Sequence, residues 1–128
     1  MRSDCPVSYG LEFFGDKWTL LIIRDMVFDQ KRFYKDFLNS GEGIATNILS
    51  DRLKKLEENG IIESSVYELK KTQKVYVLTD KGKALIPVLL EIMVWSFEHN
   101  SDLNIPAEFV RKIKADRISV TNQLKESL

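Results

Sequence analysis

KRFYKDFLNSGEGIATNILSDRLKKLEENGIIESSVYELKKTQKVYVLT, residues 31–79, is the stretch of the sequence that decides the fold. It opens with apolar residues at helical spacing over 33–38, which predict a short helix. Residues 39–43, NSGEG, form the densest turn signal in the chain, because glycine and asparagine tolerate the backbone angles of tight turns. Helical spacing resumes near residue 45 or 46 and continues to Glu58, which predicts a second helix.

Beyond residue 58 the periodicity changes from helical to alternating. Asn59-Gly60 supplies a left-handed stop for the second helix. Residues 63–69 and 75–78 then predict the two strands of a hairpin with one buried face. The turn that joins them is basic and contains Lys70, Lys71 and Lys74. Helix, turn, helix and hairpin in this order describe a winged helix-turn-helix, so the predicted fold class is mainly α with a small β-hairpin (α+β).

Further helices are predicted on both sides of this segment. Apolar residues recur at helical spacing before and after Gly15-Asp16, so we expect two N-terminal helices, with Asp16 capping the second. Thr79 should cap one long helix that continues towards His99. Pro106 is a helix start signal, and one or two more helices are expected in the tail that follows.

The length of 128 residues is typical of one compact domain. Within it we assign 1-99 to the winged helix-turn-helix and 100-128 to a C-terminal helical extension of the same domain. The extension either adds to a dimer interface or packs as a surface helix on its own subunit. A hydrophobic share of 44% is enough to build a core, and 30% charged residues keep the surface hydrated.

Composition also bounds the compartment. The first residues hold no apolar run that could act as a signal sequence, and residues 84–95 are too short and interrupted by Glu91 to span a bilayer. We therefore expect a cytoplasmic protein with no membrane partner. A single cysteine excludes an internal disulfide and fits a reducing compartment.

The overall charge argues against a nucleic-acid partner, but its distribution argues for one. Nineteen basic residues balance nineteen acidic ones, and the pI is about 6.6. Arg32 and Lys35, however, lie at the first helix of the pair, and three lysines lie in the hairpin turn, so both groups could flank a duplex. The alternative is that these short charge runs are an ordinary hydrated surface.

The second helix of the pair has an apolar face and a polar face when its residues are placed at 100° intervals. Asn47 and Ser50 lead the polar face, and they are the best candidates for reading base edges, since Asn pairs with adenine and Ser can serve either edge. Arg52 and Lys54 are expected at phosphate or guanine. Asp51 is an unfavourable neighbour there, because a carboxylate repels phosphate. The full set of candidate DNA-binding residues is Arg32, Lys35, Thr46, Asn47, Ser50, Arg52, Lys54, Lys70, Lys71 and Lys74.

Several short motifs together resemble the HxlR family, over a range from Cys5 to His99. They are Cys5-Pro6, GDKWTLLIIRD at 15–25, Arg32-Phe33, Gly43-Ile44, Leu49-Ser50, Arg52-Leu53, Leu56-Glu57, Gly60-Ile61-Ile62, Tyr76, Leu78-Thr79 and Gly82. The resemblance implies a bacterial or archaeal transcription factor related to the MarR-like winged helices. It also implies a homodimer on a palindromic operator, with dimer contacts from N- and C-terminal helices. The recognition helix, about 45-58, would enter the major groove, and the wing, about 63-78, would contact the backbone.

The sequence departs from the usual family pattern at four places. Ala45-Thr46 stands where a serine-proline pair commonly opens the recognition helix, and Asn47 and Asp51 stand where many relatives carry basic residues. Tyr34 occupies a place often held by a small capping residue. A relative's operator sequence therefore cannot be transferred to this chain.

Cys5 is the candidate for redox sensing, because the resembled family includes sensors with an N-terminal cysteine. A thiol near a helix N-terminus ionises more readily, whereas free cysteine is more often a small buried apolar residue. An unknown small molecule or oxidant is thus an open effector, and any disulfide would join two chains or a small thiol. Trp18 and Trp95 could line an effector pocket but more commonly belong to a core. His99 has no companions at ligand spacing, so we expect no metal and no cofactor.

The sequence shows no catalytic residues, because no nucleophile has an evident base, and no phosphate-binding glycine loop or acid and histidine cluster is present. The competing hypothesis is a winged-helix module that binds proteins and not DNA, since a fold does not dictate its use. The sequence does not reveal the operator, the regulated genes or the sign of regulation.

Overall fold

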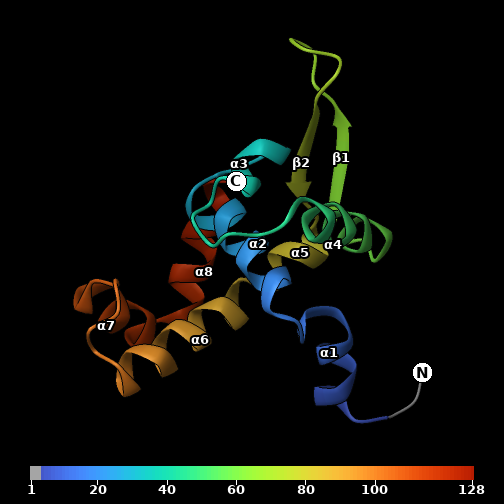
Figure 1. Cartoon of the computed structure of the whole chain (residues 1–128). Coiled ribbons are helices and arrows are strands. Elements are labelled where there is room, and N and C mark those ends of the chain that lie inside the picture. Colours follow the sequence, from blue (N-terminus) through green and yellow to red (C-terminus); the bar gives the residue numbers. More distant parts are fainter. Residues whose placement is uncertain (1–3) are drawn as a thin grey trace. The chain divides into compact units, whose positions relative to one another are not determined.

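Helices predominate in the structure, a computed structural model that describes residues 4–128, and this part of the chain also contains one antiparallel hairpin (Figure 1). The order confirms the predicted fold class. The elements are α1 (Pro6–Phe14), α2 (Lys17–Phe28), α3 (Tyr34–Leu38), α4 (Thr46–Glu58), β1 (Ile62–Val66), β2 (Lys74–Leu78), α5 (Asp80–Lys83), α6 (Ile86–His99), α7 (Ala107–Ala115) and α8 (Arg117–Glu126).

The chain forms two compact units, one that runs to Gly82 and one that spans Lys83–Leu128. The expected domain division between residues 99 and 100 stays a prediction. Residues 1–3, part of the stretch in which we looked for a signal sequence, lie outside the described residues. No helix in the described part of the chain is long and apolar enough to cross a membrane.

The core of the first unit is built on α2 and the inner face of α4. Ile23 and Val27 of α2 and Leu49 of α4 are fully buried, and Phe37 joins them from α3. As predicted, Asp16 caps α2: its carboxylate accepts hydrogen bonds from the backbone N–H groups of residues 18 and 19, both at 3.0 Å. The cap fixes where α2 begins and therefore how it supports α4.

The turn between α3 and α4 depends on glycine. Gly41 and Gly43 have φ angles of +91° and +75°, which side chains rarely adopt, so the predicted turn signal is confirmed. Arg24 of α2 holds this turn from outside, because its guanidinium bonds Glu42 at 3.0 Å and Asp25 at 2.8 Å. The start of α4 is thus tied to α2 as well as to α3.

The hairpin pairs Ile62 with Leu78 at its base and Val66 with Lys74 at its outer end. β1 stops at Val66, earlier than the expected residue 69, because the N–H of Tyr67 bonds the carbonyl of Gln73 and the chain turns there. The three lysines predicted at the turn therefore lie at or next to the tip. Gly60, with a φ of +72°, ends α4 as expected.

The prediction of a single long helix from Thr79 to His99 is wrong, because the structure has two helices there, α5 and α6. Pro87 explains the break: it has no N–H for the carbonyl of Lys83, and its ring would clash with that carbonyl in a continuous helix. The Thr79 cap itself is confirmed, since Thr79 Oγ1 accepts a hydrogen bond from the N–H of Gly82 at 3.2 Å.

In the second unit, α6, α7 and α8 pack against one another. Leu90, Val110, Ile113 and Val120 are buried in this unit. Lys114 bonds Glu98 at 3.0 Å, and Arg117 bonds Glu91, so ion pairs link α6 to the tail. The tail thus contributes two helices, where one or two were expected.

Candidate nucleic-acid interface

Helix α4 presents one buried face and one exposed polar face. Leu49, Leu53 and Leu56 are buried, while Asn47 and Ser50 are exposed on the other side. Thr46 and Lys54 are exposed as well. The structure therefore places the predicted base-reading side chains on the surface of a helix whose inner face is held in the core.

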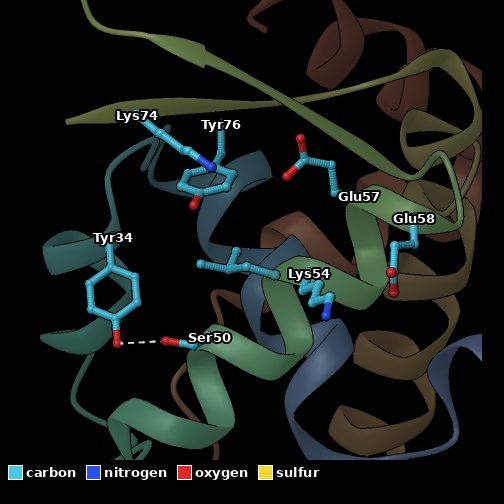
Figure 2. A pocket seen from close by; sticks show the side chains of 8 residues that line it. Tyr34, Ser50, Lys54, Glu57, Glu58, Lys74 and Tyr76 are labelled. Carbon is cyan, nitrogen blue, oxygen red and sulfur yellow. Dashed lines mark hydrogen bonds between the residues drawn. The ribbon is translucent and has the colours of Figure 1, made fainter. Parts of the chain in front are cut away.

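The first turn of α4 is held by a tyrosine. Ala45, at the N-cap, offers no side-chain bond to the helix. Instead, the hydroxyl of Tyr34 in α3 donates to the carbonyl of Thr46 at 3.1 Å and lies 3.2 Å from Ser50 Oγ (Figure 2). The short α3 thus sets the position of the helix start that would approach base edges.

A groove of about 570 Å³ runs along the exposed side of α4. Ser50 and Lys54 line it from α4, Lys74 and Tyr76 from β2, and Tyr34 from α3 (Figure 2). It brings together predicted site residues that come from the helix and from the hairpin. An anionic backbone lying here would meet an ammonium group from each element.

The far end of the same groove is acidic. Glu57 and Glu58 line it, and Glu57 accepts a hydrogen bond from Ser64 of β1 at 2.7 Å. Burial raises the pKa of the Tyr76 hydroxyl, and the negative charge of Glu57 raises it further, so Tyr76 stays a neutral donor. Because carboxylates repel phosphate, an anionic backbone would fit the N-terminal half of α4 better than this end.

Arg52 lies on the side of α4 opposite to the Ser50 and Lys54 side chains, and it does not line this groove. Its guanidinium bonds Asp16 at 2.9 Å and Asp51 at 2.5 Å. Asp51 also lies 3.3 Å from Lys55, and the hydrogen bond from Lys55 is the main cause of its lowered pKa. Asp51 is therefore neutralised locally, which reduces the repulsion expected from the sequence.

The remaining basic candidates are exposed. Lys35 and Lys74 border a second groove of about 430 Å³ between α3 and the hairpin, together with Thr72 and Gln73. The backbone carbonyl of Arg32 accepts a hydrogen bond from the N–H of Tyr76 at 2.8 Å, which sets Arg32 beside β2. In the part of the chain that the structure describes, no ion pair involves Arg32, Lys35, Lys54, Lys70, Lys71 or Lys74.

The other predicted site residues lie apart from these grooves. Cys5 is exposed at the N-cap of α1, beside Val7. Trp95 is exposed on α6 and stacks on His99, with ring centroids 4.6 Å apart. Trp18 is half-buried under the ammonium group of Lys17. Among the residues described, no group of histidine, cysteine, aspartate or glutamate side chains could hold a metal ion.

Sequence reasoning missed the roles of Tyr34 and Tyr76. Tyr34 stood out only as a departure from the family pattern, although a tyrosine at that place brings a hydroxyl within reach of α4. In the sequence, Tyr76 stands out only as one of the motifs that resemble the HxlR family. The sequence also does not indicate that Glu57 contacts the hairpin, which it does through Ser64.

Comparison with known proteins fits this geometry. Residues 13–103 match the model of the HxlR-like helix-turn-helix family. The transcriptional regulator YybR of Bacillus subtilis is 31% identical over 102 residues, which are 80% of each chain. YodB of the same organism is 34% identical over 93 residues, 72% of this chain and 82% of that protein.

Solved structures agree. The reduced form of YodB superposes with a TM-score of 0.61 and 32% identity, over 80% of this chain and 100% of that one. The oxidized form of the redox regulator HypR gives a TM-score of 0.64 and 30% identity, over 73% of this chain and 96% of that one. The chain therefore belongs to the HxlR-like helix-turn-helix family of DNA-binding transcriptional regulators, and it is not an enzyme.

Proposed function

We propose that the protein acts as a homodimer on a palindromic operator, with the N-terminal half of α4 in the major groove and the hairpin on the backbone. The observation that carries the proposal is the groove shared by Ser50, Lys54 and Lys74. It joins the exposed face of the helix to the basic hairpin, so both elements can contact the same stretch of double-stranded DNA. Its target is the genome, so the protein works in the cytoplasm.

Each exposed residue has a distinct role in this proposal. Asn47 pairs with adenine through its amide, and Lys54 contacts phosphate. Arg32, Lys35, Lys70, Lys71 and Lys74 neutralise backbone charge, and Thr46 and Ser50 complete the polar face. Arg52 supports α4 through Asp16 and does not contact the duplex, because its guanidinium is already bonded to two carboxylates.

An oxidant or electrophile acting at Cys5 is a second part of the proposal. Structural relatives include the redox regulator HypR in reduced and oxidized forms and a quinone-bound form of YodB. Cys5 is exposed, so a reagent can reach its thiol. Mass spectrometry after mild oxidation or quinone treatment tests this: an adduct at Cys5 that alters duplex affinity is expected, and an unmodified Cys5 contradicts it.

The main proposal is tested by measuring, with fluorescence anisotropy, the affinity of the protein for duplexes that it selects from genomic fragments. Affinity should fall steeply with salt, with a log-log slope of about −0.9 per phosphate neutralised. Lys71→Ala should weaken binding to all duplexes alike and reduce that slope by about 1. Asn47→Ala should instead lower the preference for the selected site by about 1 to 3 kcal/mol.

The same titrations discriminate the competing hypothesis. A winged-helix module that binds only proteins should show no affinity for any duplex, even at low salt. If both variants bind like the parent, the assigned roles are wrong.

A further inference from the structure

The two hydrogen bonds of the Tyr34 hydroxyl determine where the hydroxyl hydrogen of Ser50 points. Its hydroxyl lies 3.1 Å from the carbonyl oxygen of Thr46 and 3.2 Å from Ser50 Oγ (Figure 2). A phenol has one proton to donate, and a carbonyl oxygen can only accept. The Tyr34 proton therefore goes to Thr46. The bond to Ser50 must then be donated by Ser50, whose hydrogen points at the phenol oxygen.

In this arrangement the Ser50 hydroxyl can accept a hydrogen bond from a bound molecule but cannot donate one. A serine hydroxyl has one donor and two acceptor positions, and the donor is already used. Ser50 is exposed on the face of α4 that carries Asn47. A phosphate oxygen has no proton to offer it, so Ser50 is poorly suited to grip the backbone. A group with an N–H is the partner that it can accept from.

We infer that Tyr34 makes Ser50 an acceptor-only reader, which selects a base whose major-groove edge carries an amine. Those amines are N6 of adenine and N4 of cytosine, whereas guanine and thymine present carbonyl oxygens at the corresponding places. A serine without such a partner could serve either kind of edge. The inference rests on the proposed function, since it requires α4 to enter the major groove. Tyr34 is then a positioning residue that sets specificity through Ser50.

The test removes single atoms from the bases. Sites are first selected from a randomised duplex library, and Ser50→Ala identifies the base pair whose preference depends on Ser50. That pair is then remade with purine for adenine or pyrimidin-2-one for cytosine, which deletes the amine. In a second set, 2-aminopurine for guanine or 5-methylpyrimidin-2-one for thymine deletes the carbonyl oxygen.

The wild type should lose about three- to tenfold in affinity on amine deletion, the value of one hydrogen bond. On carbonyl deletion, the wild type should lose no more affinity than Ser50→Ala does. Any loss from weakened base pairing affects both proteins equally. In Tyr34→Phe the Ser50 proton is released, so the distinction between amine and carbonyl should disappear. Ser101→Ala, which removes an exposed hydroxyl from the loop after α6, should behave like the wild type.

Three results would overturn the inference: a Ser50-dependent loss on carbonyl deletion only, an unchanged amine preference in Tyr34→Phe, or no base pair that responds to Ser50→Ala. The first and third of these use no Tyr34 variant, so they decide the question even if Tyr34→Phe folds poorly. Failure of the proposed function looks different, because the wild type would then enrich no duplex from the library at low salt.

Discussion

Asp16 performs two tasks with one carboxylate. It caps α2 through the backbone at residues 18 and 19, and it bonds Arg52 on the side of α4, 2.9 Å away. Partial burial alone would raise the pKa of Asp16, but hydrogen bonds from Thr19 and Arg52 and from the capped backbone outweigh it and lower the pKa. These contacts therefore favour the ionised carboxylate, and the link between the start of α2 and α4 is strongest in that form.

This link predicts a pH dependence. A carboxyl group with a lowered folded-state pKa adds stability above its unfolded value of about 3.9, and that stability is lost as the pH falls through the folded-state pKa. At pH 7 the wild type should exceed Asp16→Asn in free energy of unfolding by up to about 1 kcal/mol, since the pair is partly exposed. Urea titrations at several pH values should show the difference shrinking below about pH 4. A difference that does not shrink at all as the pH falls below 4 contradicts the role given to the charge.

Residues whose partners are close in sequence could be predicted, and those with distant partners could not. The Asp16 and Thr79 caps act within three residues, so the sequence shows donor and acceptor together. The contact between Arg52 and Asp16 could not be predicted, because the two residues lie 36 positions apart in the sequence. Tyr34 reaches Ser50 across 16 residues, a distance over which spacing carries no information.

At the level of elements, α5 is set against the base of the hairpin by a residue without a side chain. A Cβ added at Gly82 would lie 2.2 Å from the carbonyl oxygen of Ile61 and 2.8 Å from a methyl carbon of Leu78. Backbone atoms at the first of these contacts cannot move away cheaply. Hairpin and helix can therefore approach this closely only because residue 82 is glycine.

Gly82→Ala should destabilise the protein by about 1 to 3 kcal/mol or more, as overpacking does. Gly10→Ala is the matched control, because its added Cβ meets only the Phe14 ring, at 3.2 Å, and alanine favours a helix by about 1 kcal/mol. Urea unfolding of both variants measures the difference. Equal stabilities would mean that α5 and β1 are less closely packed than described.

The elements themselves were largely foreseen from periodicity, and the exception has a clear cause. Thr79 and the apolar rhythm predicted one helix as far as His99, but Pro87 outweighed that rhythm and divided it. The wing was placed correctly although its first strand is shorter than expected. Strand ends depend on which backbone groups pair across the hairpin, and alternation of side chains does not report that.

At the scale of the whole molecule, exposed apolar side chains on α1 and α6 bear on assembly, although other elements carry such side chains too. Val7 of α1 is 69% exposed and Trp95 of α6 is 64% exposed, and no residue of α1 is buried. Exposed apolar faces of this kind are typical of protein interfaces. They support the proposal that these helices contact a second copy of the chain.

Val7→Glu and Trp95→Glu should each shift the protein from dimer to monomer, because a carboxylate at an apolar interface must give up its hydration. Sedimentation at micromolar concentration measures this. Leu69→Glu is the control, since Leu69 is also exposed but lies in the hairpin turn, where no dimer contact is proposed. A dimer that survives both helix variants places the interface elsewhere.

Two-fold symmetry of such a dimer also constrains its target. The two copies of α4 would enter successive major grooves, so the selected site should contain inverted half-sites about 34 Å apart, one turn of 10 to 10.5 base pairs, or a multiple of that. Inserting five base pairs between the half-sites turns one of them to the opposite side of the duplex. In an anisotropy titration, the affinity of the wild type should then fall to that for a single half-site. Val7→Glu should bind the original duplex and the duplex with the insertion at that same lower affinity. If the insertion leaves wild-type affinity unchanged, the two helices do not bind as a rigid pair.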